Sequence, residues 1–209
     1  MIHGDPSGLS LLSTRPPSAI PVYLGVESGC SSTTLAKIGY VNSDVSTLGA
    51  FYRGTPNGSN AVLMNASEVK LLQAEAVARG YAQGDASALY KQGIRLSMQY
   101  YGIANDAIDA FLSQQNVQLA DGDAIEKILT QKWMSLFFIG YQGWYEYLRT
   151  GYPKLSKPLD NRNPTAPGEV PSRFYYPETE QAVNITNYNA AIKAQGGSDD
   201  INTKLWWEK

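Results

Sequence analysis

The stretch from Asp123 to Pro153, DAIEKILTQKWMSLFFIGYQGWYEYLRTGYP, decides the expected fold of this chain. Asp121 or Asp123 is placed to cap a helix start, and Gly151 followed by Pro153 is the usual order of residues at a helix end. Apolar residues recur between these ends at helical spacing: Leu129, Trp133, Leu136, Phe137, Gly140, Trp144, Tyr147 and Leu148. The pattern predicts one helix of about 27 residues, roughly 40 Å long. Its aromatic faces require other helices to pack around it.

Two helices joined by a short turn are predicted before this stretch. The first begins at a capping box formed by Asn65 and Glu68 and ends at Gly80. Its expected apolar stripe consists of Val69, Leu72 and Ala76. The second helix follows a cap at Asp85 and ends before Gly102. Its expected core face consists of Tyr90, Ile94, Ser97, Met98 and Tyr101. Such a pair forms an antiparallel αα-hairpin, the unit from which tetratricopeptide solenoids are stacked.

The remaining segments are predicted to be irregular or only briefly helical. Residues 1–60 are rich in Pro, Gly and Ser, including the run from Ser28 to Thr34, and allow at most a short strand at Ile20 to Gly25. Short helices are expected at 105–115, 177–182 and 184–193, with a proline-rich loop over 154–171. The terminal Trp206 and Trp207 are expected to dock. We therefore expect a mainly α fold, with a tetratricopeptide-like helical hairpin, a long central helix and extensive irregular loops.

The composition excludes several functional classes. With 17 basic and 19 acidic residues the net charge is −2, which argues against nucleic acid as a partner. The single histidine, His3, argues against a histidine-based metal site or a Ser-His-Asp triad, and the single cysteine, Cys30, excludes an internal disulfide. No run of about 18 apolar residues predicts a membrane span, and the first residues lack the pattern of a signal peptide. We expect no metal and no cofactor.

Five motifs lie in order along the chain. The segment NASEVKLLQAEAVA at 65–78 carries an E-x-x-x-L-x-A-E-A pattern, and YKQGIRLSMQYYG at 90–102 is the second motif. QKW at 131–133, with Trp144 and RTGYP at 149–153, forms a third block. VPSRFYYPETE at 170–180 is a Pro-bounded turn, and LWWE at 205–208 is the last motif. Together and in this order, the five motifs resemble the C-terminal part of the SusD/RagB family.

The resemblance implies a non-enzymatic component of an outer-membrane uptake system at the cell surface. Members of the family are exported lipoproteins that bind an oligosaccharide or another nutrient and act with a SusC-like TonB-dependent transporter. Full members are longer than this chain, and their N-terminal half bears a lipid anchor. Cys30 does not match that anchor, so we expect a C-terminal portion whose membrane attachment depends on a lipid outside this chain. The expected organisation is a loop-rich, possibly ligand-facing segment at 1–60 and a helical region at 61–209, forming one domain.

The candidate ligand-binding residues lie in the loop-rich segment, because binding residues concentrate on loops. Sugars present C–H faces to aromatic rings and hydroxyls to polar groups. The candidates are Tyr23, Tyr40, Phe51, Tyr52 and Arg53. In contrast, the helical aromatics Trp133, Phe137, Trp144 and Tyr147 and the terminal tryptophans are expected to serve packing. Arg149 is expected to stabilise a helix end, and Arg173 to tie its loop to the helices.

Two other functions remain as alternatives. An αα-repeat scaffold could bind a protein partner and no small ligand. A glycoside hydrolase would need a pair of carboxyl groups, and Glu68 with Glu75 is the available pair. Their expected separation of about 10 Å along one helix exceeds the roughly 6.5–9.5 Å of inverting enzymes, and Glu68 is better explained as a capping residue. We therefore predict no catalytic residues.

Overall fold

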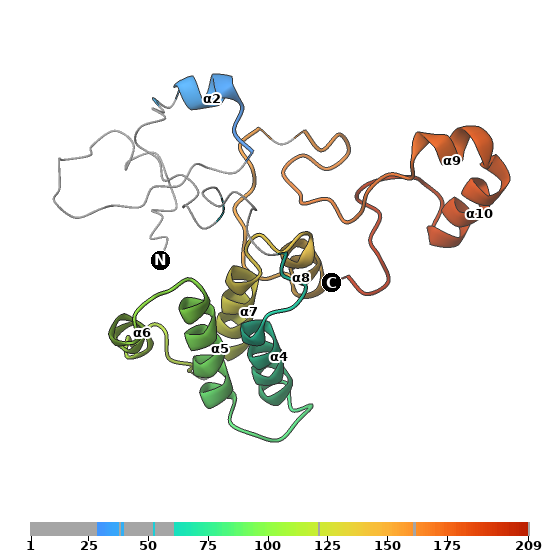
Figure 1. The fold of residues 1–209 in the computed structure, drawn as a ribbon. Coiled ribbons are helices and arrows are strands. Elements are labelled where there is room, and N and C mark those ends of the chain that lie inside the picture. The colour runs from blue at the N-terminus through green and yellow to red at the C-terminus, as the bar shows by residue number, and fades with distance from the viewer. Residues whose placement is uncertain are drawn as a thin grey trace. The chain divides into compact units, whose positions relative to one another are not determined.

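The computed structural model describes residues 29–37, 39, 52, 61–120, 122–160 and 162–208. Its helices are α2 (Ser32–Lys37), α4 (Ala66–Ala78), α5 (Ala86–Tyr100), α6 (Asn105–Leu112), α7 (Ala124–Ser135), α8 (Gln142–Thr150), α9 (Glu178–Val183) and α10 (Ile185–Gln195) (Figure 1). These described residues contain no strand, and the mainly α fold class is confirmed. Within the same residues, no helix has both the length and the apolar character needed to cross a membrane.

The chain divides into two compact units. Residues 60–155 with 206–209 form one, called the helical unit below, and residues 1–59 with 156–205 form the other, called the loop unit. In the helical unit α4 lies beside α5, and both pack on α7 (Figure 1). The predicted hairpin is therefore present, with α7 covering it. The short helix α6 packs on α5, and α8 packs on α7.

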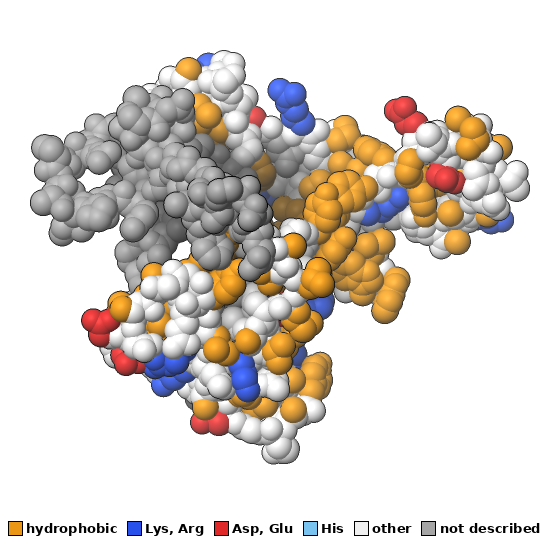
Figure 2. Space-filling model, viewed as in Figure 1, with side chains coloured by type: hydrophobic (Ala, Val, Ile, Leu, Met, Phe, Trp, Pro, Cys, Tyr) orange, Lys and Arg blue, Asp and Glu red, His pale blue; other side chains and the backbone are white. Residues whose placement is uncertain are grey.

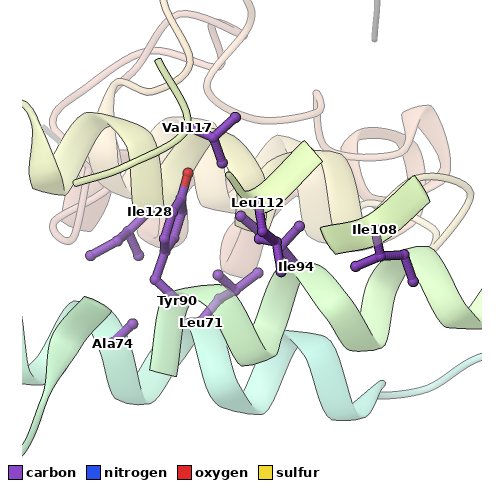
Figure 3. Packing of buried hydrophobic residues seen from close by; sticks show 8 residues of the cluster. All are labelled: Leu71, Ala74, Tyr90, Ile94, Ile108, Leu112, Val117 and Ile128. Carbon is purple, nitrogen blue, oxygen red and sulfur yellow. The ribbon is translucent and has the colours of Figure 1, made fainter. Parts of the chain in front are cut away.

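The core of the helical unit lies between α4, α5, α6 and α7. Figure 3 shows its buried side chains converging from these helices and from the turn after α6: Leu71, Ala74, Tyr90, Ile94, Ile108, Leu112, Val117 and Ile128. Leu71 is fully buried against Gly93, where an added Cβ would stand 2.6 Å from the Leu71 Cγ atom. The two helices of the hairpin can approach this closely because Gly93 has no side chain. Ser67 strengthens the same contact by donating a hydrogen bond to the Gly93 carbonyl at 2.7 Å.

The buried face of α4 differs from the predicted stripe. Val69 and Leu72 are each 38% exposed, whereas Leu71 and Ala74 are fully buried. Apolar residues occur on all sides of α4, so their spacing alone does not indicate which face is buried. The face that is buried also carries polar groups with partners on other helices, Ser67 and Glu75 among them. On α5 the predicted face is confirmed at Tyr90 and Ile94, which are 1% and 2% exposed.

The stretch at 123–153 forms two helices, so the prediction of one long helix is wrong. Turns with backbone hydrogen bonds of three-residue spacing replace the α-helix between Leu136 and Gln142. Phe138 and Gly140 both have left-handed φ angles, 63° and 48°, which a right-handed helix cannot contain. The break lets Leu136 and Ile139 point inward, at 4% and 8% exposure. The predicted end is confirmed, because Gly151 is a left-handed C-cap with φ of 72°.

The predicted packing role of the aromatic residues in this stretch is only partly confirmed. Phe137 is 52% exposed, which contradicts the prediction, and Trp133, Trp144 and Tyr147 are partly buried. The most buried side chains of the stretch include two leucines instead: Leu129 and Leu148 are 0% and 4% exposed. The helix break explains this outcome, because it changes the register of α8 relative to α7.

In the loop unit, a helix occurs where the composition predicted only loop. Helix α2 begins after Ser31, whose backbone N–H donates to Asp160 Oδ2 at 2.6 Å, and the Thr34 hydroxyl donates to Asp160 Oδ1 at 2.9 Å. The backbone N–H of Ser31, with the Thr34 hydroxyl, holds the pKa of the Asp160 carboxyl below its usual value. This acceptor comes from a distant part of the sequence, so local composition could not reveal it. The short helices predicted at 177–182 and 184–193 are confirmed as α9 and α10.

Arg173 connects two segments of the loop unit, but its partners lie outside the helices to which it was predicted to tie its loop. Its Nη1 atom forms an ion pair with Asp199 Oδ1 at 3.0 Å, although the two atoms are not aligned as a hydrogen bond. The Arg173 guanidinium carbon also lies 4.8 Å from the centre of the Tyr176 ring. The backbone N–H of Ser172 donates to the Ile201 carbonyl at 2.8 Å. These contacts attach the proline-bounded loop to the segment that follows α10.

Candidate functional site

A cavity of about 300 Å³ lies in the helical unit beside α8. It is lined by Glu68, Leu136, Gln142, Tyr145, Glu146, Arg149 and Trp207. Four of these residues come from α8, where spacing of three and four residues places side chains on one helix face. Glu68 comes from the first turn of α4, and Leu136 from the turn between α7 and α8. The volume is at the lower end of small-molecule sites, which are roughly 300–1,000 Å³.

Aromatic rings form one wall of the cavity. The Tyr145 and Trp207 rings meet edge to face with centroids 6.4 Å apart, and Trp144 stacks on Tyr145 at 5.4 Å. The predicted docking of the C-terminal tail is thus confirmed for Trp207. It is wrong for Trp206, which is 95% exposed. Figure 2 shows hydrophobic side chains at the surface over the helices of the helical unit.

An ion network that shares Glu146 and Arg149 with the cavity wall joins α4, α7 and α8. Lys132 Nζ lies 3.0 Å from Glu146 Oε2 and 3.7 Å from Glu75 Oε2. Arg149 donates to both oxygens of Glu75, at 3.0 and 2.7 Å, and to both oxygens of Glu146, at 2.7 and 3.3 Å. Arg79 adds a further bond to Glu75 at 2.8 Å. Each carboxylate is therefore held by two or more cations from different helices.

The network shifts the pKa values of Glu75 and Arg149. Burial by itself raises the pKa of the Glu75 carboxyl, but the hydrogen bonds and charge of Arg149, together with Arg79 and Lys132, outweigh burial and hold that pKa below its usual value. Burial by itself lowers the pKa of Arg149, and its bonds to Glu75 and Glu146 raise it well above the usual value. Glu75 is thus an anion with a fixed role and not a proton donor.

Arg149 lines the cavity, yet its guanidinium is occupied by the protein. It makes four hydrogen bonds to Glu75 and Glu146, and a guanidinium has five N–H donors. The predicted contact of Arg149 with helix-end carbonyls is therefore replaced by bidentate carboxylate pairs. Little of its donor capacity remains for a ligand.

Glu68 is the contrasting acidic residue of the cavity. The Asn65 side chain accepts the Glu68 backbone N–H at 2.6 Å, which confirms half of the predicted capping box. The Glu68 side chain does not complete the box: the residue is 8% exposed, and its Oε2 atom has no hydrogen-bond partner. Asn65 instead donates to the Ser135 carbonyl at 3.0 Å, joining α4 to α7.

The residues predicted from sequence to bind ligand lie in a different part of the chain. Tyr23, Tyr40, Phe51 and Arg53 lie outside the described residues, and Tyr52 is described as helical and partly buried. Their role stays a prediction. The sequence reasoning assigned none of the cavity residues to ligand binding, because Gln142 and Tyr145 were placed within one continuous helix. Gly140 was the available signal, since a glycine inside a helical pattern can mark a break.

The residues that the structure describes contain no group of three or more histidine, cysteine, aspartate or glutamate side chains arranged to hold a metal ion. The candidate site is therefore defined by its aromatic wall, its amide and its carboxylates.

Comparison with known proteins identifies relatives over most of the chain. The family model of SusD-like proteins, described as starch-binding and associating with the outer membrane, matches residues 13–177. None of the curated proteins matches the chain.

Solved structures match with the same fold. A SusD homologue from Bacteroides fragilis is 35% identical with a TM-score of 0.74, and the match covers 88% of this chain and 43% of that one. A Bacteroides vulgatus protein ascribed to nutrient binding at the outer membrane is 29% identical with a TM-score of 0.74, covering 90% and 43%. A chitin-binding protein is 36% identical with a TM-score of 0.62, covering 68% and 32%. The chain thus spans less than half the length of these solved relatives.

Proposed function

The chain belongs to the SusD/RagB family of SusD-like proteins, and from this membership we propose that it is a non-enzymatic, glycan-binding component of a nutrient-uptake system at the outer membrane. The observation that carries the proposal is the family match over residues 13–177, which includes both the loop-rich segment and the helical hairpin. Its members are described as starch-binding, and one solved relative is described as chitin-binding. An oligosaccharide is accordingly the proposed ligand class.

The chemistry of the acidic residues supports binding without catalysis. A glycosidase needs one carboxylic acid that can donate a proton and a second carboxylate across the scissile bond. Glu75 is held ionised by Arg149 and lies within the ion network, so it is unsuited to proton donation. We therefore assign Glu75 a structural role and propose that the bound sugar leaves chemically unchanged.

Localisation and partner follow from the family in the same way. We place the protein at the cell surface, attached to the outer membrane and acting with a SusC-like TonB-dependent transporter that receives the bound glycan. The loop-rich segment at 1–60 remains the proposed ligand-facing region, and 61–209 the helical support. A pull-down with the transporter encoded beside this gene tests the partnership, and absence of such a neighbour would count against it.

Titration calorimetry with a panel of oligosaccharides tests the binding role. Saturable binding is expected for the full-length protein, with the oligosaccharide recovered intact by chromatography. Alanine variants of Tyr23, Tyr40, Phe51, Tyr52 and Arg53 test the loop candidates, and we expect some of them to weaken binding about tenfold or more, the loss of an aromatic or arginine contact. Tyr81→Ala is the matched control, because Tyr81 is 80% exposed on the α4–α5 turn of the helical unit. Hydrolysis of any oligosaccharide would refute the non-enzymatic assignment.

A protein-binding scaffold is the second candidate, favoured by the exposed apolar side chains of the helical unit. Leu63, Met64, Phe138 and Tyr141 are 89%, 63%, 60% and 59% exposed, and such residues suit a protein contact. A scaffold would bind a protein partner with the same affinity whether oligosaccharide is present or absent, and it would give no heat with any glycan. Saturable glycan binding decides between the two.

A further inference from the structure

The break between α7 and α8 carries an exposed apolar surface of the helical unit. Phe137, Phe138 and Tyr141 of this turn are 52%, 60% and 59% exposed. The Phe137 and Phe138 rings contact each other edge to face with centroids 4.8 Å apart, so their apolar surfaces are continuous. Tyr141 extends this surface toward α8, where its ring centroid lies 6.0 Å from that of Trp144.

The segment before α4 adds two aliphatic side chains beside the break. The Asn65 side chain donates to the Ser135 carbonyl at 3.0 Å, which places the residues just before α4 at the end of α7. Leu63 and Met64 of this segment are 89% and 63% exposed. A segment that is distant in the sequence therefore contributes apolar surface at the same end of α7.

The C-terminal tail adds the most exposed ring. The Trp207 ring contacts Tyr145 of α8 with centroids 6.4 Å apart, and this contact holds the tail on α8. The neighbouring Trp206 is 95% exposed. The exposed apolar residues of these three segments, all in the helical unit, are called the apolar patch below: Leu63, Met64, Phe137, Phe138, Tyr141 and Trp206.

The apolar patch has the size and composition of a surface that another part of a protein covers. An aromatic side chain has about 150–250 Å² of surface, so the exposed fractions of the four aromatic members correspond to roughly 500 Å². The two aliphatic members bring the total above the roughly 300–600 Å² of the largest patch on a typical monomer and toward the roughly 800 Å² per partner of a stable interface. None of the six side chains is charged, as in permanent interfaces that resemble a core cut in half.

The solved relatives indicate which molecule supplies the cover. Their matches include 88% and 90% of this chain but only 43% of the relatives' own chains. More than half of each relative therefore lies outside the matched fold. A segment of the same polypeptide reaches the patch at an effective concentration of about millimolar, whereas a second copy must associate from solution. The longer polypeptide is thus favoured over a second copy as the source of the cover.

We propose that the apolar patch is the surface on which an apolar segment of the longer polypeptide packs. That segment presents aliphatic or aromatic side chains and no unpaired charge, because the patch offers no counter-charge and burying an unpaired charge is costly. The patch then belongs to the interior of the full-length protein, and it is not a docking site for a separate partner. This inference does not depend on glycan binding.

Hydroxyl-radical footprinting with mass spectrometry tests the cover in the unmodified proteins. The 209-residue chain is compared with the full-length protein that the gene encodes. Met64 and Trp206 should be oxidised at least tenfold more slowly in the full-length protein. Tyr81 is the control, because it is 80% exposed on the α4–α5 turn, and it should be oxidised at the same rate in both. A concentration series separates a cover within one polypeptide from a second copy.

Phe138→Asn gives a second test, because its expected effects on the two proteins differ in sign. Phe138 has a φ angle of 63°, which asparagine adopts more readily than a bulky residue. In the 209-residue chain the urea midpoint should therefore not fall. In the full-length protein it should fall by about 1 M or more, because a packed ring is replaced by a buried amide. Tyr81→Asn is the matched control and should shift both midpoints equally.

Equal oxidation of the patch in the two proteins would overturn the inference, and so would an equal shift of both midpoints in Phe138→Asn. Protection in the 209-residue chain that grows with its concentration would assign the patch to a second copy. Protection in that chain at every concentration would assign it to the loop unit. Both outcomes contradict a cover from the longer polypeptide. Failure of glycan binding in calorimetry would refute the proposed function and leave the cover standing.

Discussion

Replacing Lys132 by methionine tests whether the buried ion network holds the helical unit together. The ammonium lies 3.0 Å from Glu146 and 3.7 Å from Glu75, and the side chains of all three residues are no more than 7% exposed. Removing one partner of a buried pair costs about 3–5 kcal/mol, because the remaining charge is left without compensation. Arg149 still contacts both carboxylates in the variant, so we expect a loss at the lower end, about 3 kcal/mol.

Urea unfolding followed by tryptophan fluorescence measures this loss. All four tryptophans belong to the helical unit, so the signal reports on that unit alone: Trp133, Trp144, Trp206 and Trp207. A loss of 3 kcal/mol should lower the midpoint by about 1–3 M urea, given a slope of about 1–3 kcal/mol/M. The double variant Lys132→Met with Glu146→Leu should be more stable than Lys132→Met alone, because it removes a buried carboxylate that has lost one of its two cationic partners.

A loss below about 1 kcal/mol in Lys132→Met would refute the reasoning, since the buried ammonium would then not be a required counter-charge. Strictly additive losses in the double variant would refute it as well, because independent sites add and members of one network do not.

Two further perturbations test the hairpin core. In Gly93→Ala the new Cβ would stand 2.6 Å from Leu71 Cγ, and the resulting overpacking should cost about 1–3 kcal/mol of stability. This cost should outweigh the roughly 1 kcal/mol gained in helix propensity, and urea unfolding measures the difference. Gln92→Ala, at an exposed position in the same helix, is the control and should show no loss of stability. Burial, with the Asp123 carboxylate, raises the pKa of Tyr90 to about 12. Because the unfolded chain ionises first, the free energy of unfolding should be unaffected by this group below pH 10 and fall by roughly 2 kcal/mol as pH rises to 12. The Tyr90→Phe variant should lack this fall, and an identical alkaline profile in both proteins would contradict the assignment.

Local signals in the sequence were sufficient to locate most helices of the helical unit. Asn65 and Asp85 cap α4 and α5 through hydrogen bonds to backbone N–H groups at 2.6 and 3.0 Å, as predicted. Gly80 and Gly151 end their helices with left-handed φ angles. These signals are reliable because they involve atoms only a few residues apart in the chain, and the same bonds form whatever packs around them.

The features that sequence reasoning missed depend on distant partners. The buried face of α4 is selected by partners on other helices: Ser67 bonds to α5, and Glu75 pairs with Arg149 74 residues away. The backbone N–H of Ser31, just before helix α2, donates to Asp160, which lies 129 residues further along the chain. The cavity was not predicted because its wall is formed by α8 and Leu136, which follow from the break between α7 and α8 at Phe138 and Gly140. Apolar periodicity continued through that break and concealed it.

Three of the residues that identify the family serve the packing of the helical unit. Among the matched motifs, Glu75, Lys132 and Arg149 bind one another and have little capacity left for a sugar. A protein can keep these three residues and bind different glycans, because they determine how α4, α7 and α8 pack. Glu68 belongs to the same motifs and lines the cavity, and its Oε2 atom is buried without a hydrogen-bond partner.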